Sequence, residues 1–429
     1  MANFIQTVEL LWLNHSYSNL DKPETHWHTL AISKDGSMPN ISNWFTQPWQ
    51  QIKQRFMSSN DDRMVPLDQV SRFYQSDFYQ SLDANLKSAF YDGPLGGLDS
   101  RVIHRKDVDT LMSYYKLWQQ GRNISCALYG EKGTGLSTLM NVLIQEIKQG
   151  DQAYKIISLE KRIQSEQDFL NTLSKSLGMK EKAYKLDEFI TCLLQLPPTV
   201  IAVDNLHFLV QRTLNAQAVV DSVSAIIIAT SGHHFWLLAS EEQAWRRLCY
   251  GYDFEQLVSH QHHVANFNER DMRELLINRF AYAGFHTIND IPTEKLHSEK
   301  SPINHIARRC KGCVELGLFY CLNNLTYGTK PQSILLMPAD EIDMASLKKL
   351  SQKSLFTLAE ISTHGQLSPK EHSKVFRMEI TESKRLLEHL RGLGVLDKNE
   401  DANSHDGYSL KLIISAVVIR YLISMNYLY

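Results

Sequence analysis

The feature that most constrains the fold of this chain is a glycine-rich segment at residues 130–138. An apolar run at 124–129 precedes it, and an amphipathic segment at 137–148 follows it. A strand, a glycine-rich turn and a helix in this order can surround phosphate oxygens with backbone N–H groups and a helix N-terminus. The pattern therefore predicts a phosphate-binding P-loop. Its residues are Gly130, Glu131, Lys132, Gly133, Thr134, Gly135, Leu136, Ser137 and Thr138.

The sequence around this loop predicts an α/β core. Apolar runs at 155–159, 199–204 and 225–229 alternate with segments of helical pattern. This alternation is typical of a parallel sheet covered by helices on both faces. The run 199–204 ends in Asp204, and we interpret its carboxylate and the Ser137 hydroxyl as ligands of Mg²⁺; the alternative for Asp204 is a polar strand end over the loop. The expected ligand of the whole site is ATP or ADP with Mg²⁺.

Two residues that ATP hydrolysis needs are replaced. The phosphate-binding lysine of such a loop belongs at position 136, which is Leu136. A glutamate that activates water is expected after Asp204, but the chain has Asn205, which can orient water and cannot accept its proton. Lys132 could reach the phosphates, although an exposed loop lysine is the more ordinary interpretation. We assign Asp204 and Asn205 as the catalytic positions and expect hydrolysis to be absent or very slow, with the nucleotide either retained or lost.

Two further pairs of residues are candidates for the same site. Thr230 and Ser231 follow the run 225–229, at a strand end where a polar sensor of the γ-phosphate is expected; a turn-forming role is the equal alternative. Arg246 and Arg247 follow a predicted helix, in a place that often presents an arginine finger to a neighbouring subunit. The equal alternative for these two residues is a solvated basic pair.

These residues together resemble the AAA+ ATPases, in their origin-recognition, type II secretion and transposition-helper branch. The resemblance covers roughly residues 101–335. Besides the loop, it depends on residues 203–209, Val-Asp-Asn-Leu-His-Phe-Leu, which are similar to an aspartate, glutamate, any residue, histidine signature. Residues 270–284 look like the helix that opens a lid, and residues 307–315 look like a lid helix that carries a sensor arginine in the family. In this chain Glu315 stands where that arginine would fall.

The resemblance implies a P-loop core at 101–265, a helical lid at 266–335 and a winged-helix domain at 340–429. The last of these regions contains three predicted helices, then a short apolar run at 392–396, a polar loop at 401–407 and a final apolar stretch. The expected fold class is α/β: an AAA+-like parallel sheet with a helical lid, a C-terminal winged helix and an aromatic-rich N-terminal region.

Residues 1–100 are the part that the pattern constrains least. The segment 91–97, Tyr-Asp-Gly-Pro-Leu-Gly-Gly, is rich in turn formers and predicts a domain boundary. The density of aromatic residues before it argues for a folded or partner-buried module, because disordered segments are poor in them. Its tryptophans are Trp12, Trp27, Trp44 and Trp49.

Composition excludes a disordered, a collagen-like and a small disulfide-stapled protein. Apolar residues make up 43% and charged residues 21% of the 429 residues, as in soluble globular proteins. The net charge is −2, and the region from 340 onwards holds equal numbers of basic and acidic residues, so DNA binding is not favoured. Six cysteines in so long a chain indicate a reducing compartment. No apolar run reaches the roughly 18 residues of a membrane helix, and we expect a cytoplasmic protein without a membrane span.

We therefore expect a catalytically impaired AAA+-like protein that acts as a nucleotide-sensing or scaffold subunit of a larger assembly. It would form an oligomer and dock protein partners through its N-terminal region, its winged helix and its apolar tail. One alternative is an active ATPase in which Lys132 substitutes for the missing lysine. Another is a DNA-binding initiator or transposition helper whose winged helix contacts the duplex.

Overall fold

The structure, a computed structural model, describes residues 64–180, 184–210, 216–296, 301–399 and 407–428. These residues belong to one compact unit that begins at Asn60. The tryptophans of the predicted N-terminal module lie outside the described residues.

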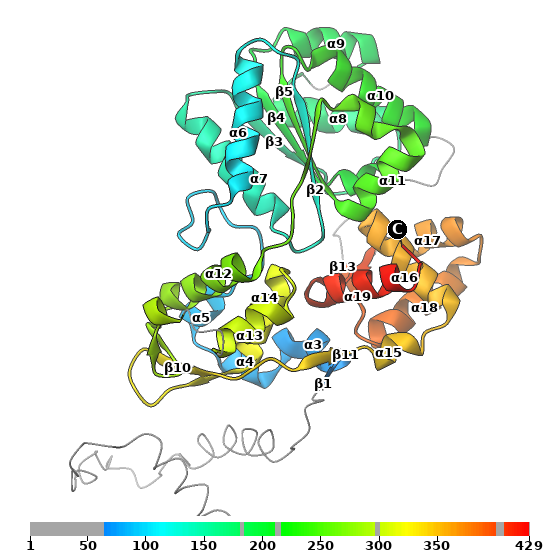
Figure 1. The fold of residues 1–429 in the computed structure, drawn as a ribbon. Coiled ribbons are helices and arrows are strands. Elements are labelled where there is room, and N and C mark those ends of the chain that lie inside the picture. The colour runs from blue at the N-terminus through cyan, green and yellow to red at the C-terminus, as the bar shows by residue number, and fades with distance from the viewer. Residues whose placement is uncertain (1–63, 181–183, 211–215, 297–300, 400–406, 429) are drawn as a thin grey trace, which may run out of the picture. The chain divides into compact units, whose positions relative to one another are not determined.

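A five-stranded sheet forms the centre of this unit (Figure 1). Its order is β3-β4-β5-β2-β6, and every neighbouring pair is parallel. The parallel α/β sheet predicted from the sequence is thus confirmed. The strands are β2 Ser125–Gly130, β3 Tyr154–Ser158, β4 Val200–Asp204, β5 Phe235–Glu241 and β6 His260–His263.

Helices cover both faces of the sheet, as Figure 1 shows. The first face carries α6 Lys106–Gln119 and α7 Leu136–Gln149. The second carries α8 Glu166–Leu177, α9 Leu186–Leu194, α10 Ala216–Thr230 and α11 Glu242–Tyr252. Helix α7 packs on the sheet because its apolar residues recur every three or four positions and form one stripe. The buried residues of that stripe are Leu139, Met140, Leu143, Ile144 and Ile147.

The predicted strand at 225–229 is wrong, because these residues belong to helix α10. A short apolar run has the same appearance in a buried strand and in a buried helix. The longer pattern shows the difference: Val219, Val220, Val223, Ile226 and Ile227 are buried, at helical spacing. The strand that enters the sheet after β4 is instead β5, which starts after the helix has ended.

A helical region with a small sheet follows β6. It contains α12 Glu269–Tyr282, α13 Pro302–Arg309 and α14 Val314–Asn323. The sequence pattern predicts one helix from 302 to 325, but the structure has two, because the backbone leaves the helical conformation at Lys311 and Gly312, with φ of 50° and 79°. The sequence of residues 329–338 predicts a linker, but this segment contains a strand. The small sheet has the order β8-β7-β10-β9, from Thr287–Ile288 (β7), Ile291–Pro292 (β8), Leu325–Tyr327 (β9) and Ser333–Leu336 (β10).

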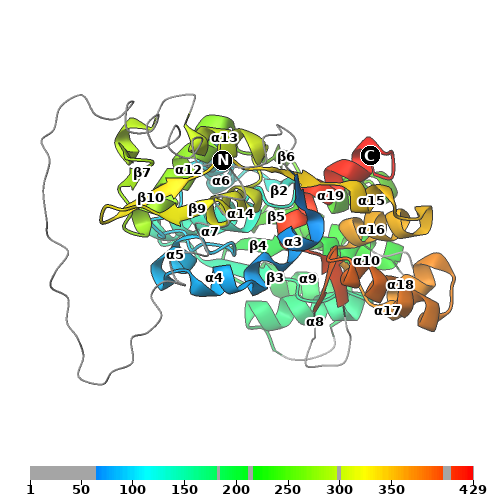
Figure 2. The same cartoon turned by 90° about the horizontal axis from the view of Figure 1, so that it is seen from below.

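The described part of the N-terminal region packs with these helices and forms no separate module. Phe73 and Phe90 contact Phe319 and Phe280, with ring centroids 5.1 and 4.7 Å apart. The predicted boundary at 91–97 lies against helix α7 through two hydrogen bonds of the Leu95 backbone. Figures 1 and 2 both place α3 between helices α12–α14 and the helices of the C-terminal region. The elements are β1 Met64–Pro66, α3 Leu67–Arg72, α4 Asp77–Ser81 and α5 Ala84–Ala89, and β1 pairs in parallel with β11 Glu341–Asp343.

The C-terminal region has helices followed by an antiparallel strand pair and a last helix. Its strands β12 Gln366–Leu367, β13 Leu396–Asn399 and β14 Gly407–Leu410 form a sheet of order β12-β14-β13. Helix α17 begins at Pro369 with a capping box, in which the side chains of Ser368 and Glu371 each accept a backbone N–H. The helices are α15 Ala345–Lys348, α16 Gln352–His364, α17 Pro369–Phe376, α18 Ile380–Gly392 and α19 Leu412–Ser424.

The apolar tail of the chain packs largely into its own core. In α19, Ile414, Val418 and Leu422 are fully buried, in one cluster with residues of α14 and α16. The expectation that this tail docks a partner is therefore wrong for this buried face. Within the described part of the chain, none of the helices combines the length and the apolar character that a membrane crossing requires.

Candidate functional site

A cavity of about 270 Å³ opens where the central strands end. It is lined by the glycine-rich loop, by the turn at 91–95, by the ends of β4 and β5, and by residues of α12 and α14. The cavity thus joins the loop, the sheet and the helical region that follows the sheet.

The loop has the strand-loop-helix geometry that the sequence predicted. Strand β2 ends at Gly130, and helix α7 begins at Leu136. Gly133 and Gly135 have φ of 91° and 80°, a region that other residues rarely adopt. The hydroxyl of Thr134 is buried and has no hydrogen-bond partner among the described residues. A phosphate oxygen would accept a hydrogen bond from this hydroxyl, so the loop fits a phosphate group.

Ser137 and Asp204 meet at the mouth of the loop. The Ser137 hydroxyl donates to Asp204 Oδ2 at 2.9 Å, and the backbone N–H of Asn205 donates to Asp204 Oδ1 at 2.8 Å. Burial raises the pKa of Asp204, and both hydrogen bonds oppose this rise. A hydroxyl and a carboxylate are oxygen ligands of the kind that Mg²⁺ prefers. These two residues therefore fit Mg²⁺, which would neutralise phosphate charge there.

Asn205 uses its side chain to hold the neighbouring strand end. Its amide donates to Ser158 Oγ at 3.1 Å and to the carbonyl of Leu159 at 3.3 Å. Its backbone has φ of 63°, a conformation that asparagine adopts more readily than glutamate. The local geometry thus gives a physical reason for asparagine at this position.

Lys132 and Glu241 form an ion pair inside the cavity, with 3.3 Å between Nζ and Oε1 and 19% of each side chain exposed. The interpretation of Lys132 as an exposed loop lysine is therefore wrong. Burial raises the pKa of Glu241, but the Lys132 ammonium outweighs this and the pKa lies below its ordinary value. Glu241 was not predicted from the sequence, because the predicted strand lies in the apolar run of α10 and not in the run that ends in Glu241.

The structure does not bring Thr230 and Ser231 to the cavity. Thr230 Oγ1 accepts a hydrogen bond from the indole of Trp236 at 2.9 Å. Trp236 is near the start of β5, whereas the loop follows the end of β2. Both hydroxyl residues therefore lie at the opposite end of the parallel strands from the loop. Their assignment as sensors depended on a strand that is a helix, and it is wrong.

Arg246 and Arg247 stand on α11. Arg246 forms an ion pair with Glu242 at 2.5 Å, and 54% of its side chain is exposed. Neither arginine is among the described residues that line the cavity. An arginine finger acts on the site of a neighbouring copy, so this role stays a prediction.

Glu315 brings the helical region into direct contact with the loop. The backbone N–H of Val314 donates to the Gly133 carbonyl at 3.1 Å. A Cβ atom on Gly133 would lie 2.2 Å from Glu315 Oε2, so a larger residue would have to displace this carboxylate. Burial raises the pKa of Glu315, which Cys313 Sγ contacts at 3.4 Å. An acid therefore occupies the place where the AAA+ resemblance implies an arginine.

Part of the cavity lining is apolar. Arg105 closes one side, because its guanidinium donates to the Thr134 carbonyl at 2.7 Å and lies over the Phe267 ring at 4.4 Å. A flat, weakly polar group such as a nucleobase suits such a lining. The apolar residues are Ile103, Val108, Leu139, Val142, Leu275 and Leu318.

The segment that follows Asp204 contacts the C-terminal region. It forms the 3₁₀ helix η2, Leu206–Leu209, in which His207 is buried against Gly365. Burial lowers the pKa of His207 to about 4. Sequence reasoning singled out this histidine only as part of the AAA+ signature.

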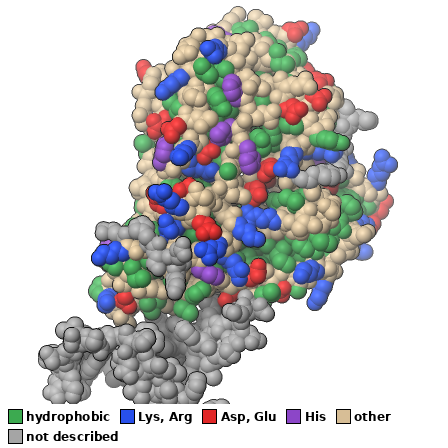
Figure 3. Space-filling view, viewed as in Figure 1, with side chains coloured by type: hydrophobic (Ala, Val, Ile, Leu, Met, Phe, Trp, Pro, Cys, Tyr) green, Lys and Arg blue, Asp and Glu red, His purple; other side chains and the backbone are tan. Residues whose placement is uncertain are grey.

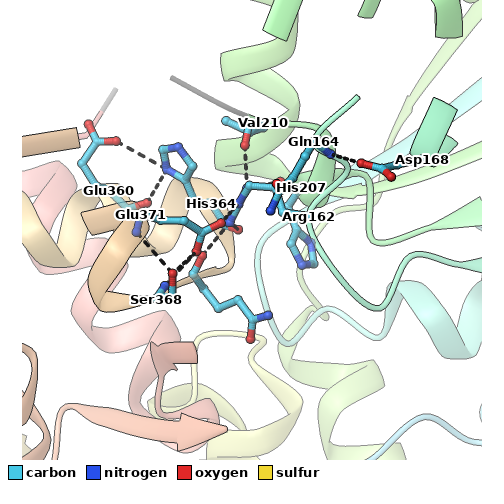
Figure 4. Close-up of polar contacts among 10 residues, drawn as sticks. Arg162, Gln164, Asp168, His207, Val210, Glu360, His364, Ser368 and Glu371 are labelled. Carbon is cyan, nitrogen blue, oxygen red and sulfur yellow. Dashed lines mark hydrogen bonds and ion pairs between the residues drawn. The ribbon is translucent and has the colours of Figure 1, made fainter. Parts of the chain in front are cut away.

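Arg162 joins the two regions at this point (Figure 4). Its guanidinium donates to Glu371 Oε1 at 2.8 Å and to the carbonyls of Val210, His364 and Gln366 at 2.5, 3.0 and 2.6 Å. The acceptors lie on both sides of the junction. No motif indicated this arginine, because its partners follow it by 45 to 209 residues.

A second contact links the loop itself to helix α19. Arg420 Nη2 donates to Glu131 Oε2 at 2.9 Å, and Asn266 Nδ2 donates to the same oxygen at 2.8 Å. Burial raises the pKa of Glu131, but these partners outweigh it and lower the pKa. The loop is thus held from the C-terminal helix and from the segment that leads into α12.

Comparisons with known proteins found similar structures only. No family model and no curated protein sequence matches the chain. The ORC2 protein of Aeropyrum pernix with ADPNP and ADP is 12% identical, with a TM-score of 0.39 over 79% of this chain and 98% of that one. Cdc6p of Pyrobaculum aerophilum is 13% identical, with a TM-score of 0.41 over 80% and 99%. The ORC1 protein of Aeropyrum pernix in complex with DNA is 10% identical, with a TM-score of 0.43 over 80% and 100%.

Proposed function

We propose that this chain is an AAA+-like subunit that binds ATP or ADP with Mg²⁺ in the cavity and senses which nucleotide is present. The observation that carries the proposal is the arrangement of the loop with the Ser137–Asp204 pair, at 2.9 Å, beside an apolar compartment. A loop for phosphates, two oxygen ligands for the metal and an apolar site for the base make up the parts that a nucleotide–Mg²⁺ complex needs.

Sensing is supported by the two contacts between the cavity and the C-terminal region. Asp204 is followed directly by η2, which Arg162 and His207 hold against the C-terminal helices. Glu131 of the loop is held by Arg420. A ligand that shifts the loop and the end of β4 would therefore change both contacts. ATP and ADP would have different effects on the C-terminal region only if they interact differently with its two arrangements.

We infer that the C-terminal region is a winged helix that docks proteins. Helices α16, α17 and α18 followed by the strand pair β13–β14 have the order of such a domain. Charges do not favour DNA as its partner, because Lys384 and Arg385 on α18 alternate with Glu382 and Glu388. Figure 3 likewise shows basic and acidic side chains interspersed over one face of the molecule.

The wider assignment follows the same proposal. The core would comprise residues 101–265, the lid 266–335 and the winged helix 340–429, and the chain would work in an oligomer. Leu136 and Asn205 lack the charge and the base that the usual positions supply, so binding is the central property.

Isothermal titration of the full chain with ATP and ADP, with and without Mg²⁺, tests the proposal. We expect binding of at least one nucleotide and a Mg²⁺ dependence that Asp204→Ala abolishes. Asp187→Ala on the exposed first turn of α9 is the matched control and should leave the titration unchanged. Absence of binding of both nucleotides to a folded chain would refute the function.

A further inference from the structure

We propose that Lys132 and Glu241 are a relocated catalytic pair, through which the cavity hydrolyses ATP to ADP and inorganic phosphate. Lys132 neutralises the charge of the γ-phosphate, and Glu241 accepts the proton of the attacking water. The inference rests on the proposed function, because it requires that ATP bind in this cavity.

The carboxylate that is expected at the end of one strand stands at the end of the neighbouring strand. The end of β4 carries the amide of Asn205 where a carboxylate is expected, and the end of β5 carries the carboxylate of Glu241 where a polar sensor is expected. Strand β5 lies between β2 and β4, and Glu241 pairs in register with Gly130 of the loop. Glu241 therefore stands between the loop and the metal ligand.

The arginines that line the cavity have partners of their own. Arg101 donates to the Asp99 carboxylate, Arg105 to the carbonyls of Thr134 and Ala265, and Arg279 to the carbonyl of Ala89. Lys132 has its ammonium on a flexible four-carbon stem inside the cavity, where its ion-pair partner among the described residues is Glu241. A phosphate entering the loop would offer this ammonium a second anionic partner.

Hydrolysis of ATP needs only water as a second reactant and Glu241 as the group that accepts a proton. The water oxygen forms a bond to the γ-phosphorus while one water proton moves to the Glu241 carboxylate. The bond between the γ-phosphorus and the β,γ-bridging oxygen breaks, and the electron pair leaves with ADP. Glu241 then releases its proton to solvent. In the free protein Lys132 keeps this carboxylate ionised, which is the form that can accept the proton.

Phosphate release and nucleotide affinity should be measured on the full chain and on its variants. Glu241→Gln should lower ATP turnover at least tenfold and leave ATP affinity within about threefold, because a general base contributes about 10²–10⁴-fold to rate. Lys132→Met should weaken ATP affinity about tenfold, the worth of one charged hydrogen bond. Glu255→Gln and Lys155→Met, both at exposed positions, are the matched controls and should change neither quantity.

The outcomes separate the inference from the proposed function. If ATP binds but phosphate release by the unaltered chain equals that of Asp204→Ala, the catalytic pair is refuted and the binding function stands. Turnover by Glu241→Gln at the level of the unaltered chain would refute it equally. If Glu241→Gln fails to fold, Glu241→Asp keeps the charge with a shorter reach, and undiminished turnover by that variant would refute the pair. Absence of binding of both nucleotides would refute the function itself.

Discussion

Arg162 offers the sharpest test of the junction between the core and the C-terminal region. Its side chain is 9% exposed, and it holds Glu371, whose side chain is 30% exposed. Replacement by alanine removes one charge-assisted pair and leaves the carbonyls of Val210, His364 and Gln366 without this donor. Breaking a buried ion pair by removing one partner costs about 3–5 kcal/mol, and we expect Arg162→Ala to lose this much stability.

The assay is denaturant unfolding, followed by tryptophan fluorescence, with limited proteolysis under native conditions. Arg162→Ala should lower the unfolding midpoint, and the C-terminal region should become more accessible to protease because this contact joins it to the core. Arg308→Ala is the matched control, since the Arg308–Glu269 pair is 62% exposed on both sides and such pairs contribute about 0–1 kcal/mol. A loss below about 1 kcal/mol for Arg162→Ala, equal to that of the control, would refute the reasoning.

Three further outcomes follow from the same structure. Leu136→Lys should tighten ATP binding about tenfold in a calorimetric titration, since it supplies the charged contact that the loop lacks; unchanged affinity would mean that the position does not face phosphate. Burial lowers the pKa of His207 and of His372 to about 4, from 6.5, so the unfolded chain binds more protons between these values. Stability should therefore fall as pH decreases from 6.5 towards 4, and His372→Asn should flatten this dependence in thermal unfolding. Light scattering should show an oligomer that Arg246→Ala with Arg247→Ala weakens, and a monomer in the unaltered chain would contradict the assignment.

The sequence was most informative where the residues of a feature are adjacent in the chain. The loop could be predicted because strand, glycines and helix are adjacent in the chain, and Asp204 because a strongly apolar strand ends in it. The structure places Asp204 within 2.9 Å of Ser137, although its metal-binding role stays a prediction. The break near Gly312 was missed, because the apolar pattern continues through it.

The remaining features depend on contacts between distant residues. Arg162 is an ordinary arginine in the sequence, and its importance comes from acceptors far along the chain. Pattern alone could not place residues 64–90 beside helices α12 and α14, because Phe73 and Phe90 pack on residues of these helices about two hundred positions later. Pattern shows which side chains are apolar and leaves their partners open.

The error at 225–229 had the largest consequence, because it also hid a candidate catalytic residue. Once that run is a helix, the strand beside the loop becomes β5, and its last residue is an acid where a neutral sensor was expected. Leu136 and Asn205 indicate a loss of activity only if the lysine and the glutamate must stand at these two motif positions. The residues of a site are brought together by the fold. Here Lys132 comes from an earlier position in the same loop, and Glu241 comes from the adjacent strand. Two absent motif residues therefore do not by themselves establish an absent activity, and the turnover of Glu241→Gln decides between these interpretations.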